Sequence, residues 1–229
     1  MKAHIILAAL VITLTIPAAC LAAPARPGGY MSGFIGAAFL RDTNITTDDF
    51  TLNTTIYEKA EFDPGINVGL TGGFDFGYAR LEGELSYKHG SMSEIIDRSD
   101  NFHFRNVDGD LAALAFLFNG FVDLHNDSPI TPYVGAGAGF ATLYLSDTYG
   151  TDTRGGFVSR PLLYEEDVDS VFAYQVGGGV EIAINRVLSL DVGYRYFGTS
   201  KGRFNNNSNL NSDLKFESHN AAVGFRVKF

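Results

Sequence analysis

The chain has 229 residues and a net charge of -9, with 45% apolar and 19% charged residues. This composition excludes a disordered chain, and the acidic balance argues against a general surface for nucleic acid or anionic lipid. The content of 26 Gly, 19 Phe and 11 Tyr is more typical of β-barrels than of helical enzymes.

Residues 1–22 have the form of a cleaved secretory signal peptide. Lys2 precedes an apolar run at 5–16, which is too short for a spanning helix but fits the centre of a leader. Cleavage after Ala22 would remove the single cysteine of the chain, and with it any disulfide, thiol catalysis or thiolate metal site. A lipoprotein with Cys20 as its acylated first residue is the alternative.

Beyond the leader, apolar residues recur at every second position, as in a strand with two unlike faces. In the stretch 66–76, for example, Ile66, Val68 and Leu70 alternate with Asn67 and Gly69. The first strand is apolar on both faces, so its orientation is left unassigned. The pattern predicts eight strands, at about 30–40, 65–76, 79–89, 110–123, 132–145, 171–184, 187–197 and 217–229.

The connections between these strands alternate in length. Short links lie at 77–78, 124–131 and 185–186, and long polar segments lie at 41–64, 90–109, 146–170 and 198–216. Alternating short turns and long loops are typical of outer-membrane barrels, whose long loops are extracellular. We therefore predict an all-β fold for residues 23–229, an eight-stranded antiparallel up-and-down transmembrane barrel with four solvated, mobile extracellular loops and both termini in the periplasm.

Period-two alternation also fits a soluble barrel with its apolar face inside. Strands of 10 or 11 residues match a tilted membrane crossing, and small polar-face residues suit a narrow interior, so the membrane orientation is favoured. Charged residues of the polar faces then point inward, where a buried charge must be paired. We expect an interior salt-bridge network, with a proton or ion relay as the alternative. Its members are Arg80, Glu82, Glu84, Lys88, Glu181, Asp191, Arg195 and Arg226.

Four stretches carry a family resemblance: TPYVGAGAGFA (131–141), FAYQVGGGVEI (172–182), LSLDVGYRYFG (188–198) and ESHNAAVGFRVKF (217–229). They resemble the surface-antigen family of small bacterial outer-membrane barrels, which is similar in architecture to OmpA-type and OmpX-type barrels. The resemblance implies the outer membrane of a Gram-negative bacterium and no single activity. It also implies that the barrel-assembly machinery reads the last strand, through Val223, Phe225, Val227 and the terminal Phe229.

The leading functional hypothesis is a monomeric membrane anchor that presents its loops to a host or cell-surface ligand, with outer-membrane lipid around it. The alternatives are a narrow pore for small solutes and, less favoured, a lipid-A-modifying enzyme. Glu217, Ser218 and His219 are adjacent on one strand, so Ser218 faces away from the other two. We predict no catalytic residues, cofactor or metal site, and no nucleic-acid partner.

Overall fold

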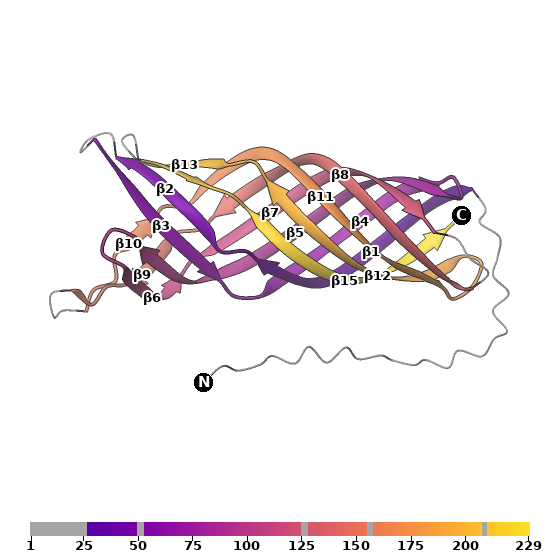
Figure 1. The fold of residues 1–229 in the computed structure, drawn as a ribbon, viewed down its shortest axis with the longest axis horizontal. Coiled ribbons are helices and arrows are strands. Elements are labelled where there is room, and N and C mark those ends of the chain that lie inside the picture. The colour runs from indigo at the N-terminus through magenta and orange to yellow at the C-terminus, as the bar shows by residue number, and fades with distance from the viewer. Residues whose placement is uncertain (1–26, 50–52, 125–127, 155–157, 208–209) are drawn as a thin grey trace.

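The computed structural model describes residues 27–49, 53–124, 128–154, 158–207 and 210–229. The predicted signal peptide, with Cys20, lies outside these residues. Figure 1 shows a long, narrow barrel of tilted strands, with the C-terminus at one end. Within the described residues, no helix is long and apolar enough to cross a membrane.

Eight long strands form the barrel wall. Each pairs antiparallel with the next long strand along the chain, and the last pairs with the first, so the sheet closes on itself. This confirms the predicted eight-stranded antiparallel barrel. The strands are β1 (Gly28–Leu40), β4 (Gly65–Asp75), β5 (Ala79–Asp97), β7 (Asp110–Asp123), β8 (Ile130–Leu145), β11 (Asp167–Ala183), β12 (Leu188–Thr199) and β15 (Glu217–Lys228).

The closing seam joins β1 to β15 in one unbroken register, from Tyr30 opposite Lys228 to Leu40 opposite Ser218. A closed seam satisfies the backbone hydrogen bonds of both terminal strands, which a barrel in lipid requires. It also fixes the facing of the first strand, which the sequence left open. Met31 and Ile35 point outward, whereas Tyr30 and Ala38 are buried inside.

Short turns join the strands at the end of the barrel that holds the C-terminus (Figure 1). Between β4 and β5, Gly77 adopts a φ of 104°, a left-handed conformation that favours glycine. Its backbone N–H donates to Asp75 Oδ1 at 2.7 Å, which ties the turn to the strand before it. We call this the short-turn end.

The four long segments at the other end differ from the loops that we expected. In their described parts they contain seven further strands that continue the wall beyond the barrel. We call segments 41–64, 90–109, 146–170 and 198–216 together the collar. Its own strands are β2 (Thr43–Asp49), β3 (Thr54–Phe62), β6 (Phe102–Asp108), β9 (Thr148–Thr151), β10 (Leu162–Tyr164), β13 (Gly202–Asn207) and β14 (Leu210–Leu214).

The collar strands form because apolar residues at alternate positions turn inward within otherwise polar segments. Ile45, Ala60, Phe104, Phe204 and Leu214 are all buried and join one hydrophobic cluster. Two small polar residues also turn inward, where the Thr47 and Ser212 hydroxyls hydrogen-bond to each other at 2.8 Å. Burial of these side chains stabilises strands that composition alone marks as loops.

Candidate functional site

The outer wall of the barrel is apolar. Leu70, Phe118 and Phe140 expose 64, 68 and 69% of their surface, although they lie in the middle of long paired strands. Their strand neighbours Thr71 and Asn119 are buried inside. An apolar band of this extent would be costly in water and suits the hydrocarbon core of a membrane.

The structure places all eight predicted interior charges inside the barrel. Glu84, Lys88 and Arg80 are almost fully buried, and even Arg195, with 17% of its side chain exposed, points into the interior. They form two groups along the barrel axis. Each group pairs cations with anions, the arrangement that buried charges require.

The first group lies toward the short-turn end and is centred on Glu181. Arg226 pairs with Glu181 and also with Asp191, at 3.1 Å. Lys228 Nζ approaches Glu181 at 2.7 Å, and Arg80 Nη1 lies 3.8 Å from the same carboxylate. One carboxylate thus serves three cations from two different strands.

The second group lies deeper and is centred on Glu84. Arg195 Nη1 is 2.5 Å from Glu84 Oε2 and Arg195 Nη2 is 3.8 Å from Glu82, while Lys88 Nζ lies 3.9 Å from Glu84 Oε1. The Gln175 amide donates to Glu84 at 2.7 Å. Both oxygens of the Glu84 carboxylate therefore have partners, with Arg195 and Gln175 at Oε2 and Lys88 near Oε1. These partners replace the water that the buried charge has lost.

Sequence reasoning missed several partners of this network. Arg80 Nε lies 2.8 Å from Asp123, and Lys228 lies 3.6 Å from Asp75. The Tyr133 hydroxyl donates to Asp191 at 2.7 Å, and the Tyr30 hydroxyl donates to Glu82 at 2.8 Å, next to the Arg226 guanidinium. Asp75 was detectable, since it shares the polar face of its strand, but Asp123 ends a strand whose two faces are hard to separate.

Toward the collar, the interior changes from polar to apolar. Lys88 Nζ lies 4.4 Å from the centre of the Phe197 ring, and Phe197 packs edge-on against Phe216. Leu117 and Leu143 from the barrel wall continue this cluster into the collar. One cavity beside Arg195 in the polar half holds only about 20 Å³, room for a single water molecule. Among the described residues, buried polar side chains occupy the half near the short turns and buried apolar side chains occupy the half near the collar.

The polar triplet Glu217, Ser218 and His219 is separated as the alternation predicts. Ser218 is buried inside the barrel, where its hydroxyl accepts from the Asn220 amide at 3.0 Å. Glu217 pairs with Arg41 at 2.9 Å, and His219 Nδ1 lies 2.5 Å from the Tyr194 hydroxyl. The three side chains are not assembled into a nucleophile, base and orienting acid.

Family comparison matches residues 6–229 to the family described as outer membrane protein beta-barrel domain. The chain belongs to this family of outer-membrane β-barrel proteins. Outer membrane protein PagN of Salmonella typhimurium is 25% identical over 229 residues, covering 90% of this chain and 92% of PagN. An uncharacterised protein of Brucella abortus is 27% identical over 209 residues, covering 78% of this chain and 70% of its relative.

Among solved structures, the outer membrane protein OprG of Pseudomonas aeruginosa has the same fold, with a TM-score of 0.55 and 15% identity. The alignment covers 88% of this chain and 96% of OprG. Because the chain belongs to the family of outer-membrane β-barrel proteins, its exposed apolar band faces lipid and the protein is located in the outer membrane of a Gram-negative bacterium. This agrees with the location expected from the sequence.

The last strand of the outer-membrane barrel has the two faces expected from its alternation. Val223, Phe225 and Val227 are about half exposed and point toward lipid, while Arg226 is buried inside. Phe229 lies beyond the strand at the short-turn end, with 79% of its surface exposed. These four apolar residues form a continuous outward row that ends at the terminus.

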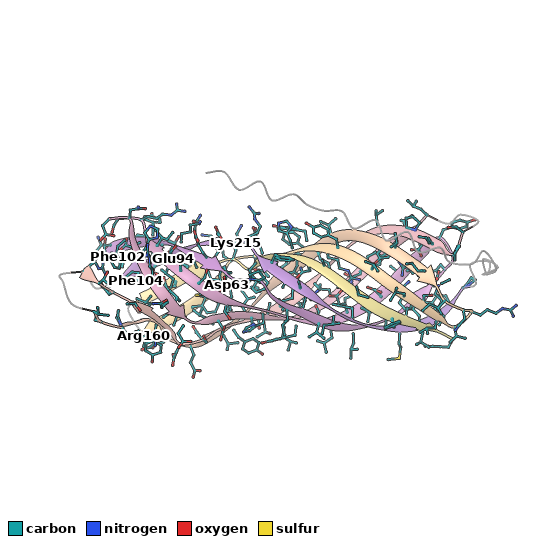
Figure 2. All side chains as sticks on the ribbon, turned by 90° about the horizontal axis from the view of Figure 1, so that it is seen from below. Asp63, Glu94, Phe102, Phe104, Arg160 and Lys215 are labelled. Atoms are coloured by element: carbon teal, nitrogen blue, oxygen red, sulfur yellow. The ribbon has the colours of Figure 1, made fainter. Side chains whose placement is uncertain are left out.

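The rim of the collar carries an organised cation-aromatic cluster that the sequence did not suggest. The Arg154 guanidinium lies 4.4 Å from the centre of the Phe102 ring and 5.0 Å from that of Phe104. Its charge is balanced by Asp152 at 2.7 Å and Asp100 at 3.5 Å. Figure 2 shows Phe102 and Phe104 together at the collar end of the molecule.

Proposed function

We propose that this outer-membrane barrel anchors a surface-interaction protein, and that its collar is extracellular and binds a host or cell-surface ligand. The observation that carries the proposal is the contrast between a filled interior and an ordered collar. A barrel packed with side chains leaves little room for transport, whereas paired strands beyond the membrane present side chains in fixed positions. Long connections of such barrels lie outside the cell.

The charge distribution of the collar divides it into two parts. Segments 41–64, 90–109 and 146–170 each contain more Asp and Glu than Lys and Arg. The segment 198–216 has the opposite balance, with Lys201, Arg203 and Lys215 exposed against the single acid Asp213. Ligands of opposite charge would therefore prefer different segments of the collar.

We infer a non-enzymatic role and hold a narrow pore as the second candidate. The separation of Ser218 from Glu217 and His219 supports the first inference. Against a pore stand the small interior cavity and the apolar cluster that fills the collar half. Channels of outer-membrane barrels normally need about sixteen strands to leave an open lumen.

The proposed partners besides the ligand are outer-membrane lipid and the barrel-assembly machinery, and the barrel is proposed to be a monomer. The exposed row of Val223, Phe225, Val227 and Phe229 supports recognition during assembly. Deletion of Phe229 is expected to lower the amount of folded protein in the outer membrane. Replacement of Phe229 by Tyr is the matched control, and normal levels of the deletion variant would argue against the assembly role.

A collar replacement tests the proposed function. In this variant, the four segments of the collar are replaced by short turns, and binding of whole cells to immobilised host cells and bacterial surface components is compared with that of the parent chain. We expect the variant to reach the outer membrane and to lose binding. Binding that survives the replacement would refute a role for the collar.

A further inference from the structure

We propose that an open groove on the outer wall of the barrel, at the level where lipid meets water, binds a single-chain amphiphile with an alkylammonium head group. The groove has a volume of about 580 Å³, within the range of small-molecule sites. It lies across four neighbouring strands, β5, β7, β8 and β11. It is separate from the interior network and from the collar rim.

A small residue between large ones creates the groove. Ala112 on β7 stands opposite His89 on one side and opposite Tyr144 on the other, and Tyr144 stands opposite Val168. Because Ala112 has only a methyl group, it forms a floor between the two ring-bearing neighbours. Tyr87, whose ring stacks against that of His89 at 6.4 Å, completes the wall nearer the membrane.

The groove crosses from the apolar wall to the polar surface. On its membrane side, β7 presents Leu114 and Phe116 outward, with 39 and 49% of their surfaces exposed. On its collar side, the outward position after Ala112 is Asp110 and the outward position after Tyr144 is Ser146. Glu166, just before β11, also lines this side. A ligand in the groove would therefore meet an apolar surface at one end and a polar one at the other.

The polar end of the groove is acidic. Asp110, Glu166 and Asp167 line it, and the lining contains neither Lys nor Arg. Asp110 Oδ1 lies 3.3 Å from His89 Nε2 and accepts a hydrogen bond from the Ser91 hydroxyl at 2.8 Å, which holds this carboxylate in place. A cationic head group has complementary charge, whereas a phosphate or sulfate would be repelled.

An organic cation fits this lining better than a metal ion does. In the part of the chain that the structure describes, no three His, Cys, Asp or Glu side chains converge closely enough to hold a metal. The carboxylates are instead spread along the polar end of the groove, which Tyr87 and Tyr144 also line. Aromatic faces attract alkylammonium groups, and nearby carboxylates add the opposite charge. The alkyl chain would then lie along Leu114 and Phe116 toward the membrane centre.

Photo-crosslinking of the full chain in nanodiscs tests this proposal. The probe is dodecyltrimethylammonium with a diazirine in its chain, and a dodecyl sulfate with the same diazirine is the comparison. Mass spectrometry of the labelled peptides is expected to place the ammonium probe on 85–91, 110–116 and 140–146. The double change Asp110→Asn and Glu166→Gln is expected to reduce this labelling about fivefold, as the loss of a partly exposed ion pair allows.

Two further variants separate the groove from general effects on the membrane surface. Ala112→Leu fills the floor and is expected to reduce labelling while leaving all carboxylates in place. Asp63, labelled in Figure 2, is an exposed acid of the collar that does not line the groove. Asp63→Asn is therefore expected to leave the labelling unchanged. Equal labelling by the sulfate probe, labelling spread around the whole barrel, or undiminished labelling of the groove variants would overturn the proposal.

Discussion

The two halves of the barrel interior have opposite character, although the same strands build both. In the half near the short-turn end, β7 directs Asn119, Phe121 and Asp123 inward. Ion pairs and hydrogen bonds fill this half, together with aromatic rings such as Phe121, which the Arg80 guanidinium contacts. In the half near the collar, the same face of β7 presents Leu111, Ala113 and Leu117 to an apolar cluster. The change occurs within one strand, between residues 117 and 119.

The exterior also changes along the axis, but nearer the collar. Outside the apolar interior face of β7, Leu114 and Phe116 still face lipid, so the exterior becomes polar only beyond them. Where the outer wall faces lipid, apolar side chains are stable outside and polar side chains are left for the interior. Beyond the membrane, water surrounds the collar, so the apolar side chains gain free energy by turning inward. The protein therefore combines the organisation of a membrane barrel with that of a soluble one along a single axis.

The largest expected effect comes from breaking the polar half. Arg195→Ala would leave Glu84 and Glu82 without their main cation, and removal of one partner of a buried ion pair costs about 3–5 kcal/mol. Urea unfolding in detergent micelles measures this loss. Arg203→Ala, at an exposed arginine of the collar, is the control and should change stability little. Unchanged unfolding of Arg195→Ala would contradict the stabilising role of the network.

A polar residue in the apolar half should cost slightly less. Leu111→Asn removes a buried side chain of the apolar cluster and places an amide opposite Leu145 of β8, for a loss of about 3 kcal/mol in the free energy of unfolding. The same urea titration measures it. A stability equal to that of the parent chain would show that this half tolerates polar groups and is not a packed core.

The converse substitution, at Asn119 in the polar half of the same strand, sharpens the comparison. Asn119→Leu removes the hydrogen bonds that Asn119 makes to Glu84 at 3.0 Å and to the Gln175 amide at 2.7 Å. The substitution leaves Glu84 and the Gln175 amide each without one hydrogen-bond partner, which costs about 2 kcal/mol of the free energy of unfolding. The variant should therefore be destabilised even though it gains an apolar side chain. Stabilisation would mean that the polar filling is dispensable.

The smallest expected effect is a dependence of the stability of the collar on pH, through Glu58. Burial raises the pKa of Glu58 above its ordinary value of 4.5, although a hydrogen bond from the Tyr164 hydroxyl opposes the shift. The folded collar then binds this proton more tightly than the unfolded chain does. Its contribution to stability is complete below pH 4.5 and is lost as the pH rises through the pKa of the folded state.

Amide hydrogen exchange of β3 and β10, corrected for the intrinsic effect of pH, measures this dependence. Protection is expected to fall as the pH rises from 4 toward neutrality, because the folded collar loses a proton that it binds more tightly than the unfolded chain does. Glu58→Gln should remove most of the dependence. An identical pH profile in the parent chain and in this variant would exclude Glu58 as its source.

Much of the barrel could be predicted from the sequence because lipid imposes a strict alternation. The strands predicted at 65–76 and 110–123 lie within a residue of the observed β4 and β7. The inward charges were found for the same reason, since Arg80 and Glu82 occupy every second position of one strand. The first strand could not be oriented, because Gly and Ala residues lie on both of its faces.

The collar could not be predicted because its strands are short and its apolar residues are sparse. Ile45 and Ala60 are isolated among polar neighbours, so that composition indicates a loop. Their burial depends on long-range pairing of β2 with β3 and of β14 with β2, which no local pattern encodes. The groove was missed for a related reason, because His89 and Asp110 meet only through pairing of β5 with β7.

Single-channel recording in planar bilayers tests the central claim most directly, namely that both halves of the interior are filled and that the protein acts through its outer surfaces. The purified full chain is inserted at known copy number, and an open porin inserted in the same way serves as the positive control. The filled interior predicts no discrete conductance steps for the parent chain. Stable, reproducible conductance steps would contradict it and would favour the pore.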